Sequence, residues 1–356
     1  MKVLVVMNSS KVKFGGGIIQ VILNYRDQLL GSPIEYSFAM NIESDEELIR
    51  KLTCFGEKYY YLPDKKVNLF RYVLSLFRIC KCEKFDAIHV HGNSATMIIE
   101  LIVAKICGVK NRISHCHNSK CSHGTLNKLL QPLLKKTYTK ALACSDIAGD
   151  WIYGKNKYIV LHNAIDLEKF RFSQEARKNI REQLCLSDDI LVIGHVGNFN
   201  EQKNQEYLIE IFKKILEKNK AVLILLGSGS LESHVKELVK EYSIEDMVFF
   251  EGVRKDVYNW MSAMDIFVFP SKWEGLGMVA IEAQACGLPV LASDQVPSSA
   301  RIADMQFLPL ETSAEIWSEK IVQMHNEAHD RKVHLADFRD YDVTIERKKL
   351  LDIYLT

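Results

Sequence analysis

Two glutamates, Glu274 and Glu282, lie in a segment that runs from Pro270 to Pro289. The segment leaves an apolar run, passes through a loop with two glycines, and continues into a helical pattern near Met278. The first turn of a helix presents unpaired backbone N–H groups and a positive partial charge, and glycines let an anion approach the backbone closely. A carboxylate accepts two hydrogen bonds at once, which suits the hydroxyl groups of a sugar. The segment therefore predicts a diphosphate site with a carboxylate on each side.

Two further loops of the second half could serve the same ligand. The segment Gly194–Asn204 carries Lys203, and Gly227-Ser228-Gly229 follows the apolar run Ala221–Leu226. A lysine ammonium can neutralise a phosphate, although a lysine taken alone is usually a solvated surface residue. A single Gly-x-Gly is weak support, because many α/β loops contain one. Both loops are candidate parts of the diphosphate site because the glutamate segment occurs in the same half of the chain.

In the first half, histidines follow two apolar runs. His91-Gly92-Asn93 follows Ala87–Val90, and His115-Cys116-His117-Asn118 lies at the end of Arg112–Cys116. A lone histidine is more often structural than catalytic, but one at a strand end can act as an acid, a base or a ligand. Gly15-Gly16-Gly17, at the start of a helical pattern, is a candidate anion site on physical grounds alone.

A metal site has to be considered near these histidines. Cys116, His117, Cys121 and His123 are all possible zinc ligands within eight positions. Their spacing fits no zinc pattern that we can name. We therefore expect no metal site.

These candidate residues need elements that bring them to the edge of a sheet. Short apolar runs alternate with helical patterns along the whole chain, which predicts parallel sheets with helices on both faces. The expected strands of the first half are Val3–Met7, Ala87–Val90, Arg112–Cys116, Leu142–Cys144 and Tyr158–Leu161. Those of the second half are Leu191–Val196, Ala221–Leu226, Met247–Phe250, Ile266–Pro270 and Pro289–Ala292. In such sheets, ligands bind at the carboxyl ends of the strands.

Length and charge divide the chain into two parts. A length of 356 residues predicts two domains. Together with the alternation of strands and helices, it predicts two Rossmann-like, doubly wound parallel-sheet domains that face each other across a cleft. We place them at 1–165 and 166–340, with a hinge near Asn163–Phe172 and a final helix, about 341–356, that could pack back on the first domain. The net charge is +10 through Ile165 and −9 beyond it, which indicates different partners for the two domains.

The glutamate pair in its strand–loop–helix setting resembles the retaining glycosyltransferases of family 4, whose architecture is called GT-B. The resemblance implies that Glu274 contacts the donor sugar and that Glu282 binds the ribose hydroxyls of the nucleotide. The loop residues beside the first glutamate then belong to the donor site as well: Gly275, Leu276 and Gly277.

The first donor loop of that family is similar to Gly194–Asn204. There, an arginine and a lysine clamp the donor diphosphate. Lys203 matches the lysine and Gly197 lies in the same loop, but the arginine position holds Asn198. Asparagine donates hydrogen bonds without a charge, so it gives up part of the attraction to phosphate.

Other segments extend the resemblance to both domains. Gly252–Val257 resembles the segment whose backbone reads the nucleotide base, which assigns Val253 and Arg254 to the donor site. Gly16 and Gly17 resemble the family's loop near the donor phosphates.

The family also keeps a histidine near the donor sugar and the reacting centre. His117 is the match, with His115 as the alternative, because the register of a predicted strand is uncertain by a residue. The resemblance thus implies catalytic roles for His117, Lys203 and Glu274. The residues expected on the acceptor side are His91, Gly92, Asn93 and His115.

The resemblance implies a bacterial enzyme that transfers a sugar with retention from a nucleotide-sugar, which we expect to be a UDP-sugar. The expected acceptor is a saccharide, often linked to polyprenyl diphosphate, in the assembly of capsule, exopolysaccharide or O-antigen. Family 4 enzymes generally need no metal for the chemistry, so we expect no cofactor and no nucleic-acid partner. Two alternatives remain: a sugar-nucleotide epimerase with the same fold, and a catalytically weak sugar-nucleotide-binding subunit of another transferase, which the Asn198 departure favours.

Nine cysteines spread over a long chain are typical of reduced thiols in the cytoplasm, and we expect neither a signal peptide nor a membrane span. Two basic amphipathic stretches, Lys65–Lys84 and Lys128–Lys140, could lie on an anionic membrane surface. The alternative is that both are ordinary surface helices that pack on the sheet. The expected location is the cytoplasm, where the first domain could contact the inner face of the cell membrane.

Overall fold

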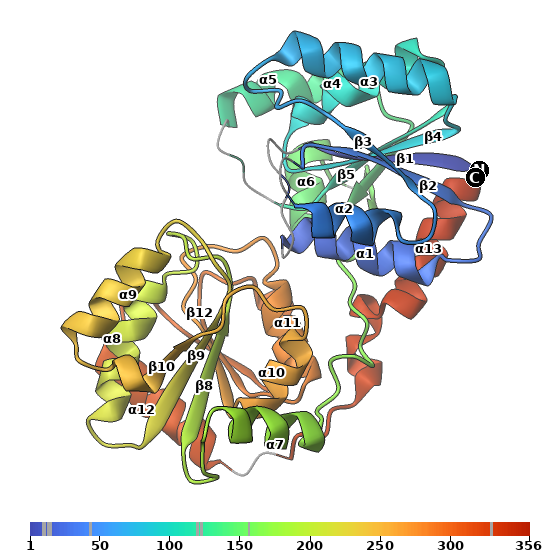
Figure 1. Cartoon of the computed structure of the whole chain (residues 1–356). Coiled ribbons are helices and arrows are strands. Elements are labelled where there is room, and N and C mark those ends of the chain that lie inside the picture. The colour runs from blue at the N-terminus through green and yellow to red at the C-terminus, as the bar shows by residue number, and fades with distance from the viewer. Residues whose placement is uncertain are drawn as a thin grey trace. The chain divides into compact units, whose positions relative to one another are not determined.

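The computed structural model describes the whole chain except residues 9–11, 13–15, 43–44, 119–120, 122–123, 156 and 328–329. The described residues form two compact units, which Figure 1 shows as two separate sheets with their helices. The first unit is Met1–Ile165 together with Asp340–Thr356, and the second is Asp166–Arg339.

A parallel sheet of seven strands forms the centre of the first unit, in the order β3-β2-β1-β4-β5-β6-β7. Its strands are β1 (Lys2–Met7), β2 (Glu35–Met40), β3 (Lys58–Tyr61), β4 (Ala87–Gly92), β5 (Asn111–Cys116), β6 (Lys140–Ala143) and β7 (Ile159–Val160). Its helices are α1 (Gly17–Gln28), α2 (Glu46–Thr53), α3 (Leu69–Glu83), α4 (Ile98–Ile106), α5 (Gly124–Leu134), α6 (Asp146–Tyr153) and α13 (Val343–Leu355).

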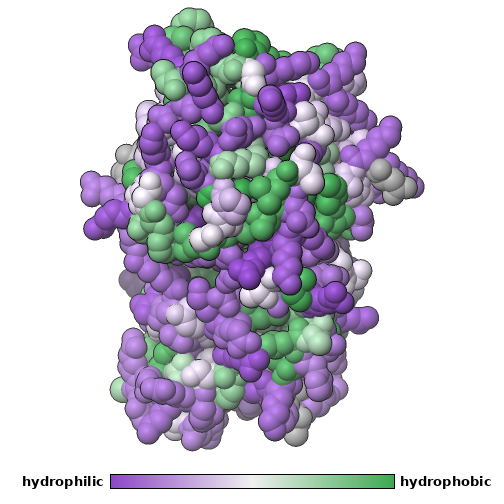
Figure 2. Space-filling view, turned by 90° about the vertical axis from the view of Figure 1, so that its right-hand side faces the viewer, coloured by the Kyte–Doolittle hydropathy of each residue, from purple (hydrophilic) through white to green (hydrophobic). Residues whose placement is uncertain are grey.

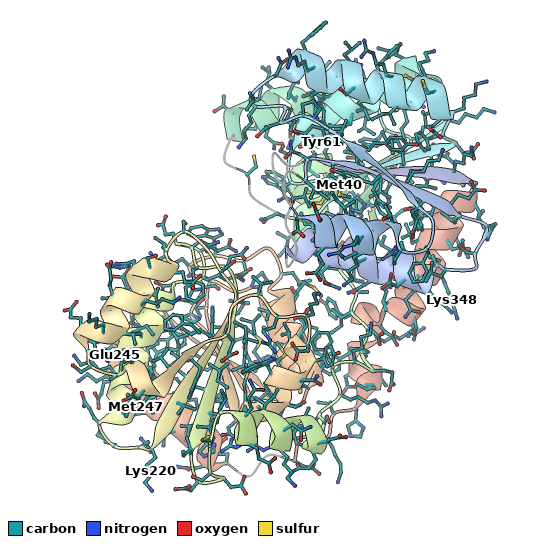
Figure 3. All side chains as sticks on the ribbon, in the orientation of Figure 1. Met40, Tyr61, Lys220, Glu245, Met247 and Lys348 are labelled. Atoms are coloured by element: carbon teal, nitrogen blue, oxygen red, sulfur yellow. The ribbon has the colours of Figure 1, made fainter. Side chains whose placement is uncertain are left out.

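Alternation along the strands gives this sheet two buried faces. On β1, Val3 and Val5 join the core beneath α1, α2 and α13, whereas Leu4 and Val6 join the core beneath α3, α4 and α6. A strand that is buried on both faces needs a continuous apolar run, which is the pattern of β1. The carboxyl ends of the parallel strands meet at one edge, as Met40 on β2 and its neighbour Tyr61 on β3 show in Figure 3.

A second parallel sheet, of six strands in the order β10-β9-β8-β11-β12-β13, forms the centre of the second unit. Its strands are β8 (Leu191–Val196), β9 (Ala221–Leu226), β10 (Val248–Phe250), β11 (Ile266–Phe269), β12 (Val290–Ser293) and β13 (Met305–Leu308). Its helices are α7 (Gln174–Gln183), α8 (Gln205–Leu216), α9 (Glu232–Glu241), α10 (Val257–Ala263), α11 (Met278–Ala285) and α12 (Ala314–Asn326). Helices α8, α9 and α12 cover one face with a core of aliphatic and aromatic side chains.

The expected fold class of parallel-sheet α/β units is confirmed. Three strands had no counterpart among those expected from the sequence: β2, β3 and β13. β2 and β3 are only partly apolar, and β3 and β13 are sheet-edge strands of four residues, so they carry a weak hydrophobic signal.

The last segment of the chain packs on the first unit. Ile165 forms a parallel bridge with Asp342, and the Arg347 guanidinium donates to the Gln28 carbonyl at 2.7 Å. Among the described residues, no helix is long and apolar enough to cross a membrane. The face drawn in Figure 2 is mainly hydrophilic, with apolar side chains gathered in several patches.

Candidate functional site

Two loops of the second unit lie together at the carboxyl edge of its sheet. They follow β8 and β11, which are neighbouring parallel strands, so both loops leave the sheet on the same side. The backbone N–H of Lys272 donates to the Gln202 carbonyl at 2.8 Å, and Asn204 Nδ2 donates to the Pro270 carbonyl at 3.1 Å. These two hydrogen bonds fix one loop against the other.

The same two loops bring Lys203 and Glu274 into direct contact. Lys203 Nζ lies 2.7 Å from Glu274 Oε1, and the side chains are only 15% and 8% exposed. The ammonium also lies 4.5 Å from the centre of the Phe269 ring. An ion pair at this depth is only weakly screened, so each charge depends strongly on the other.

Glycines permit the close packing behind this pair. A Cβ on Gly227, whose φ is +135°, would lie 2.1 Å from the Gly197 carbonyl oxygen, and one on Gly229 would lie 2.3 Å from the Phe199 carbonyl oxygen. Phe199 N–H donates to the Ser228 carbonyl at 3.0 Å. The Gly-x-Gly loop therefore supports the lysine loop from behind, which is a packing role.

Helix α11 begins directly after the glutamate loop. Gly277 precedes it with a φ of +83°, Leu276 is buried beside it, and among the described residues no side chain caps the helix. Its first N–H groups and the positive end of its dipole are thus available to an anion.

Glu282 lies on α11 and is partly buried. Burial raises the pKa of its carboxyl to about 8, while the Lys203 charge lowers the pKa. Because Lys203 also pairs with Glu274, one ammonium acts on both glutamates of the candidate site.

Three other expected donor residues lie in the second unit. Asn198 is exposed, and its backbone carbonyl accepts from Gln205 Nε2 at 3.1 Å. Val253 is exposed, whereas the Arg254 guanidinium is held by Asp256 at 3.2 Å and by the Trp260 ring. The structure does not bring Arg254 into contact with the Lys203–Glu274 pair among the described residues.

The expected phosphate loop of the first unit lies at the start of α1. Gly16 precedes the helix and Gly17 begins it; within the described ranges, no side chain caps α1 and its first turn has no acidic residue. A Cβ on Gly17 would meet no described atom within 4 Å. The first glycine of the run, Gly15, lies outside the described residues.

The expected catalytic and acceptor-side histidines are buried together in the first unit. His91 Nδ1 lies 2.8 Å from His117 Nε2, and His117 Nδ1 lies 2.8 Å from Asn163 Oδ1. Burial lowers the pKa of His117 to about 4. The ring of His117 is therefore neutral at pH 7, and both of its nitrogens already have partners.

The remaining acceptor-side residues lie where β4 ends. The Gly92 carbonyl accepts from the His117 backbone N–H at 3.1 Å, and a Cβ on Gly92 would lie 2.9 Å from Met97 Cγ. Asn93 follows and is partly buried. Of the possible zinc ligands in this part of the sequence, His123 lies outside the described residues. The thiol of Cys116 donates to the Asn118 carbonyl at 3.1 Å.

The structure adds two residues to the histidine group that the sequence did not single out. His89 lies two residues before His91 on β4, and its Nδ1 is 2.7 Å from the hydroxyl of Tyr354 on α13. The spacing of His89 and His91 places them on one face of a strand, which is the signal that could have identified His89. Tyr354 carries no such signal.

Comparison with known proteins assigns the second unit. Residues 176–332 match the family model described as glycosyl transferases group 1. These residues form a group 1 glycosyl transferase domain. The domain contains the paired loops, α11 and all donor residues of the second unit: Gly197, Asn198, Lys203, Val253, Arg254, Glu274, Gly275, Leu276, Gly277 and Glu282.

Similarity to other proteins extends over both units. The chain is 27% identical over 324 residues to a putative glycosyltransferase, EpsF, of Bacillus subtilis, which covers 86% of this chain and 84% of that protein. It is 30% identical over 238 residues to the Escherichia coli UDP-Gal:alpha-D-GlcNAc-diphosphoundecaprenol alpha-1,3-galactosyltransferase, which covers 62% of this chain and 61% of that enzyme.

Among solved structures, the fold is similar to that of HepE from Anabaena, crystallised with UDP and glucose. The TM-score is 0.80 with 18% identity, and the match covers 100% of both chains. WaaG, a glycosyltransferase involved in lipopolysaccharide biosynthesis, matches with a TM-score of 0.73 at 14% identity over 99% of both chains. These similarities concern the fold, and they confirm the expected GT-B class of two Rossmann-like domains.

Proposed function

We propose that the protein transfers a sugar from a UDP-sugar to a saccharide acceptor linked to polyprenyl diphosphate, in the biosynthesis of a surface polysaccharide. The group 1 domain and the names of relatives that act on diphosphoundecaprenol-linked saccharides support this class of reaction. UDP and UDP-glucose bound to structural neighbours support the donor class. The observation that carries the proposal is the Lys203–Glu274 pair beside the uncapped start of α11.

Donor binding is proposed to rearrange this pair. Lys203 leaves Glu274 for the diphosphate, which also receives hydrogen bonds from the first N–H groups of α11. Glu274 then accepts hydrogen bonds from hydroxyl groups of the donor sugar, and Glu282 accepts them from the ribose. Lys203 thus exchanges Glu274 for the diphosphate, and Glu274 exchanges Lys203 for sugar hydroxyl groups, so neither charge is left unpaired.

The proposed chemistry retains the configuration at the anomeric carbon. The acceptor hydroxyl attacks from the side of the leaving group, the bond from the anomeric carbon to the diphosphate oxygen breaks, and the leaving diphosphate takes the acceptor proton. Lys203 and the α11 N–H groups stabilise the charge that develops on the diphosphate. No metal is part of this scheme, so added Mg²⁺ or Mn²⁺ should not raise the rate of dialysed enzyme.

His117 enters this proposal as a neutral ring held from both sides. Its partners, His91 and Asn163, fix the orientation of the ring. His117 directly follows β5, so it lies at the carboxyl edge of the first sheet. We propose that it shapes the reacting centre by contact and does not transfer a proton there.

The acceptor's lipid is proposed to bring the first unit to the inner face of an anionic membrane. Exposed apolar residues repeat along one side of α5 at Leu126, Leu129 and Leu133, next to Lys135 and Lys136. Phe70 on α3 is 76% exposed. Helices α3, α4 and α5 lie on the same face of the sheet (Figure 1). Apolar side chains among lysines are typical of a surface that binds anionic lipid.

The test is a transfer assay with polyprenyl-diphosphate-linked saccharides and a panel of UDP-sugars, read by mass spectrometry of the lipid product. The expected product gains one sugar, and NMR shows it in the anomeric configuration of the donor. Conversion of a UDP-sugar without an acceptor would instead identify an epimerase. Donor binding with no transfer to any acceptor would support the non-catalytic subunit.

A further inference from the structure

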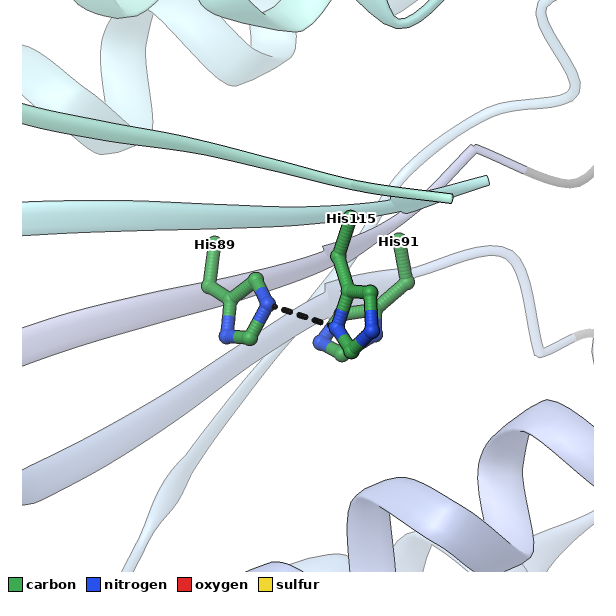
Figure 4. A group of neighbouring side chains, drawn as sticks. All are labelled: His89, His91 and His115. Carbon is green, nitrogen blue, oxygen red and sulfur yellow. Dashed lines mark hydrogen bonds between the residues drawn. The ribbon is translucent and has the colours of Figure 1, made fainter. Parts of the chain in front are cut away.

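The histidine group of the first unit has the properties of a metal site. His89 and His91 alternate on β4, and His91 is the register neighbour of His115 on β5, so the three side chains lie on the same face of the sheet. All three are at most 5% exposed. One nitrogen of each lies within 4.8 Å of the other two. Figure 4 shows the three rings next to one another on one side of the strands.

The spacing of the rings is close to that of a tetrahedral ion. His89 Nε2 lies 3.2 Å from His115 Nδ1. With zinc–nitrogen bonds of about 2.0–2.1 Å, two ligand nitrogens of a tetrahedral site lie about 3.3 Å apart. One pair therefore has the required separation already. One ring nitrogen of His91 lies within 4.8 Å of a nitrogen of each of the other two rings, so this ring has to move closer to complete the site.

The second nitrogen of each ring has a partner that orients the ring. Asn163 Oδ1 accepts from His117 Nδ1, which leaves His117 Nε2 to accept from His91 Nδ1 and frees His91 Nε2. His89 Nδ1 is bound to the Tyr354 hydroxyl, and His89 Nε2 forms a hydrogen bond with His115 Nδ1, which a cation between these two nitrogens would replace. Metal-binding histidines almost always donate their other N–H in this way.

His115 completes the set. Its Nε2 is buried and has no hydrogen bond of good geometry with any described residue. The side chain of Leu161 lines the same cavity as this ring. With its proton on Nε2, His115 presents Nδ1, the atom next to His89 Nε2, to a cation.

The surroundings can accommodate an ion and one water molecule. A cavity of about 20 Å³ touches all three rings and the side chains of Tyr36, Tyr354 and Arg26. That volume holds one water, which needs roughly 10–15 Å³. Arg26 brings no uncompensated charge, because it is paired with Glu57 at 2.9 Å and with Asp27 at 2.7 Å.

We propose that His89, His91 and His115 bind one structural Zn²⁺ ion through His89 Nε2, His91 Nε2 and His115 Nδ1, with a water molecule in the cavity as the fourth ligand. The site ties β4 and β5 together, and through Tyr354 it is connected to α13. It lies wholly within the first unit, and its ligand His91 also holds the ring of His117. Zn²⁺ binding can be measured without any sugar transfer, so failure of one proposal does not decide the other.

The test uses the full chain without a histidine tag. The protein is treated with chelator, desalted, and titrated with Zn²⁺ by calorimetry; a parallel sample receives Co²⁺. We expect one Zn²⁺ per chain, a raised melting temperature, and a Co²⁺ absorption spectrum of tetrahedral intensity. Failure of the wild-type chain to take up Zn²⁺, or an octahedral Co²⁺ spectrum, would overturn the proposal.

Variants identify the ligands. His89→Gln should lower the Zn²⁺ affinity at least 100-fold, and Tyr354→Phe, which removes the hydroxyl that orients His89, should lower it about 10-fold. The matched controls are His234→Gln and His325→Gln, two exposed histidines of the second unit, which should bind Zn²⁺ like the wild type. Loss of Zn²⁺ binding in the controls with retention in His89→Gln would show adventitious surface binding. If His89→Gln does not fold, the Co²⁺ spectrum of the wild type and the Zn²⁺ affinity of Tyr354→Phe still test the proposed site.

Discussion

Lys203 Nζ lies 2.7 Å from Glu274 Oε1, although these residues are 71 positions apart in the chain. Each has a separate proposed role, one on the donor diphosphate and one on the donor sugar. In the absence of a ligand they neutralise each other in a poorly exposed place. The pair thus keeps both charges satisfied, and in the proposed function a donor with a negative diphosphate and several hydroxyl groups replaces the contact.

Replacement of Lys203 by alanine tests its role on the diphosphate. We expect kcat/KM to fall about 10²–10³-fold, because a charge that stabilises the leaving group is lost. The matched control is Lys220→Ala, a lysine before β9 at the opposite edge of the same sheet (Figure 3), which should leave kcat/KM within twofold. Steady-state kinetics with saturating acceptor measures both, and near-normal activity of Lys203→Ala would remove this lysine from the site.

A double-mutant cycle tests the contact itself. Glu274→Gln keeps the shape of the side chain but removes its charge, and it should lower kcat at least 100-fold. The free energies of unfolding of Glu274→Gln, Lys203→Ala and the double variant should not add, because each single change leaves one charge unpaired. Urea denaturation gives the coupling, and strict additivity would mean that the ion pair does not form in solution.

The carboxyl of Glu282 predicts a pH dependence of stability. Its pKa is about 8 in the folded chain, against about 4.3 for an unperturbed glutamate, so the folded chain holds this proton more tightly than the unfolded chain. The contribution to stability is therefore full below about pH 4 and is lost as the pH rises toward 8, with a slope of at most about 1.4 kcal/mol per pH unit. Glu282→Gln should abolish this slope; urea denaturation of both proteins between pH 5 and pH 8.5 measures it. If the free energies of unfolding of the two proteins changed with pH in the same way, the assigned pKa of Glu282 would be contradicted.

Asn198 is the position where the family's arginine is missing. Its exposed side chain leaves room for a longer residue, so Asn198→Arg should fold normally. We expect UDP to bind about tenfold more tightly, with a steeper loss of affinity in salt, because a charge-assisted contact replaces a neutral one. Calorimetry at two salt concentrations measures this. Unchanged affinity would show that another cation already occupies the place of the missing arginine.

Exposed apolar residues of the first unit test the membrane proposal. The double variant Phe70→Glu, Leu129→Glu should bind vesicles of anionic lipid at least tenfold more weakly than the wild type, and wild-type binding should weaken in salt. Ile316→Glu on α12 is the control, since Ile316 is half exposed on the other unit. Vesicle sedimentation measures all three, and absence of wild-type binding at low salt would refute membrane contact.

The fold was predictable where its signal is local. β9 and the run Val3–Met7 of β1 are continuous apolar segments buried on both faces, and in β8 only Gly194 and His195 follow the apolar residues Leu191–Ile193 before Val196. Such runs can be recognised as strands from the sequence alone. β3 and β13 are short strands at sheet edges and contain polar residues, so their existence depends on the neighbouring strand and could not be seen in the segment alone.

The donor site was also predictable where its signal is local. The glutamate segment is contiguous, and the register of β8 and β11 brings its loop to Lys203. The histidine group is different, because His89 and Tyr354 are 265 residues apart and meet only when α13 packs on the sheet. No spacing in the sequence connects them.

The most direct test of the donor site is calorimetric titration of the full chain with UDP, ADP and GDP, and then with UDP-sugars. We expect selective binding of UDP, tighter binding of one UDP-sugar, and a loss of at least tenfold in affinity in Lys203→Ala. We also expect UDP to bind more tightly at pH 8 than at pH 6, since the proposed contact with the ribose needs Glu282 as a carboxylate. Binding of no nucleotide at either pH, or equal binding by Lys203→Ala, would contradict the account.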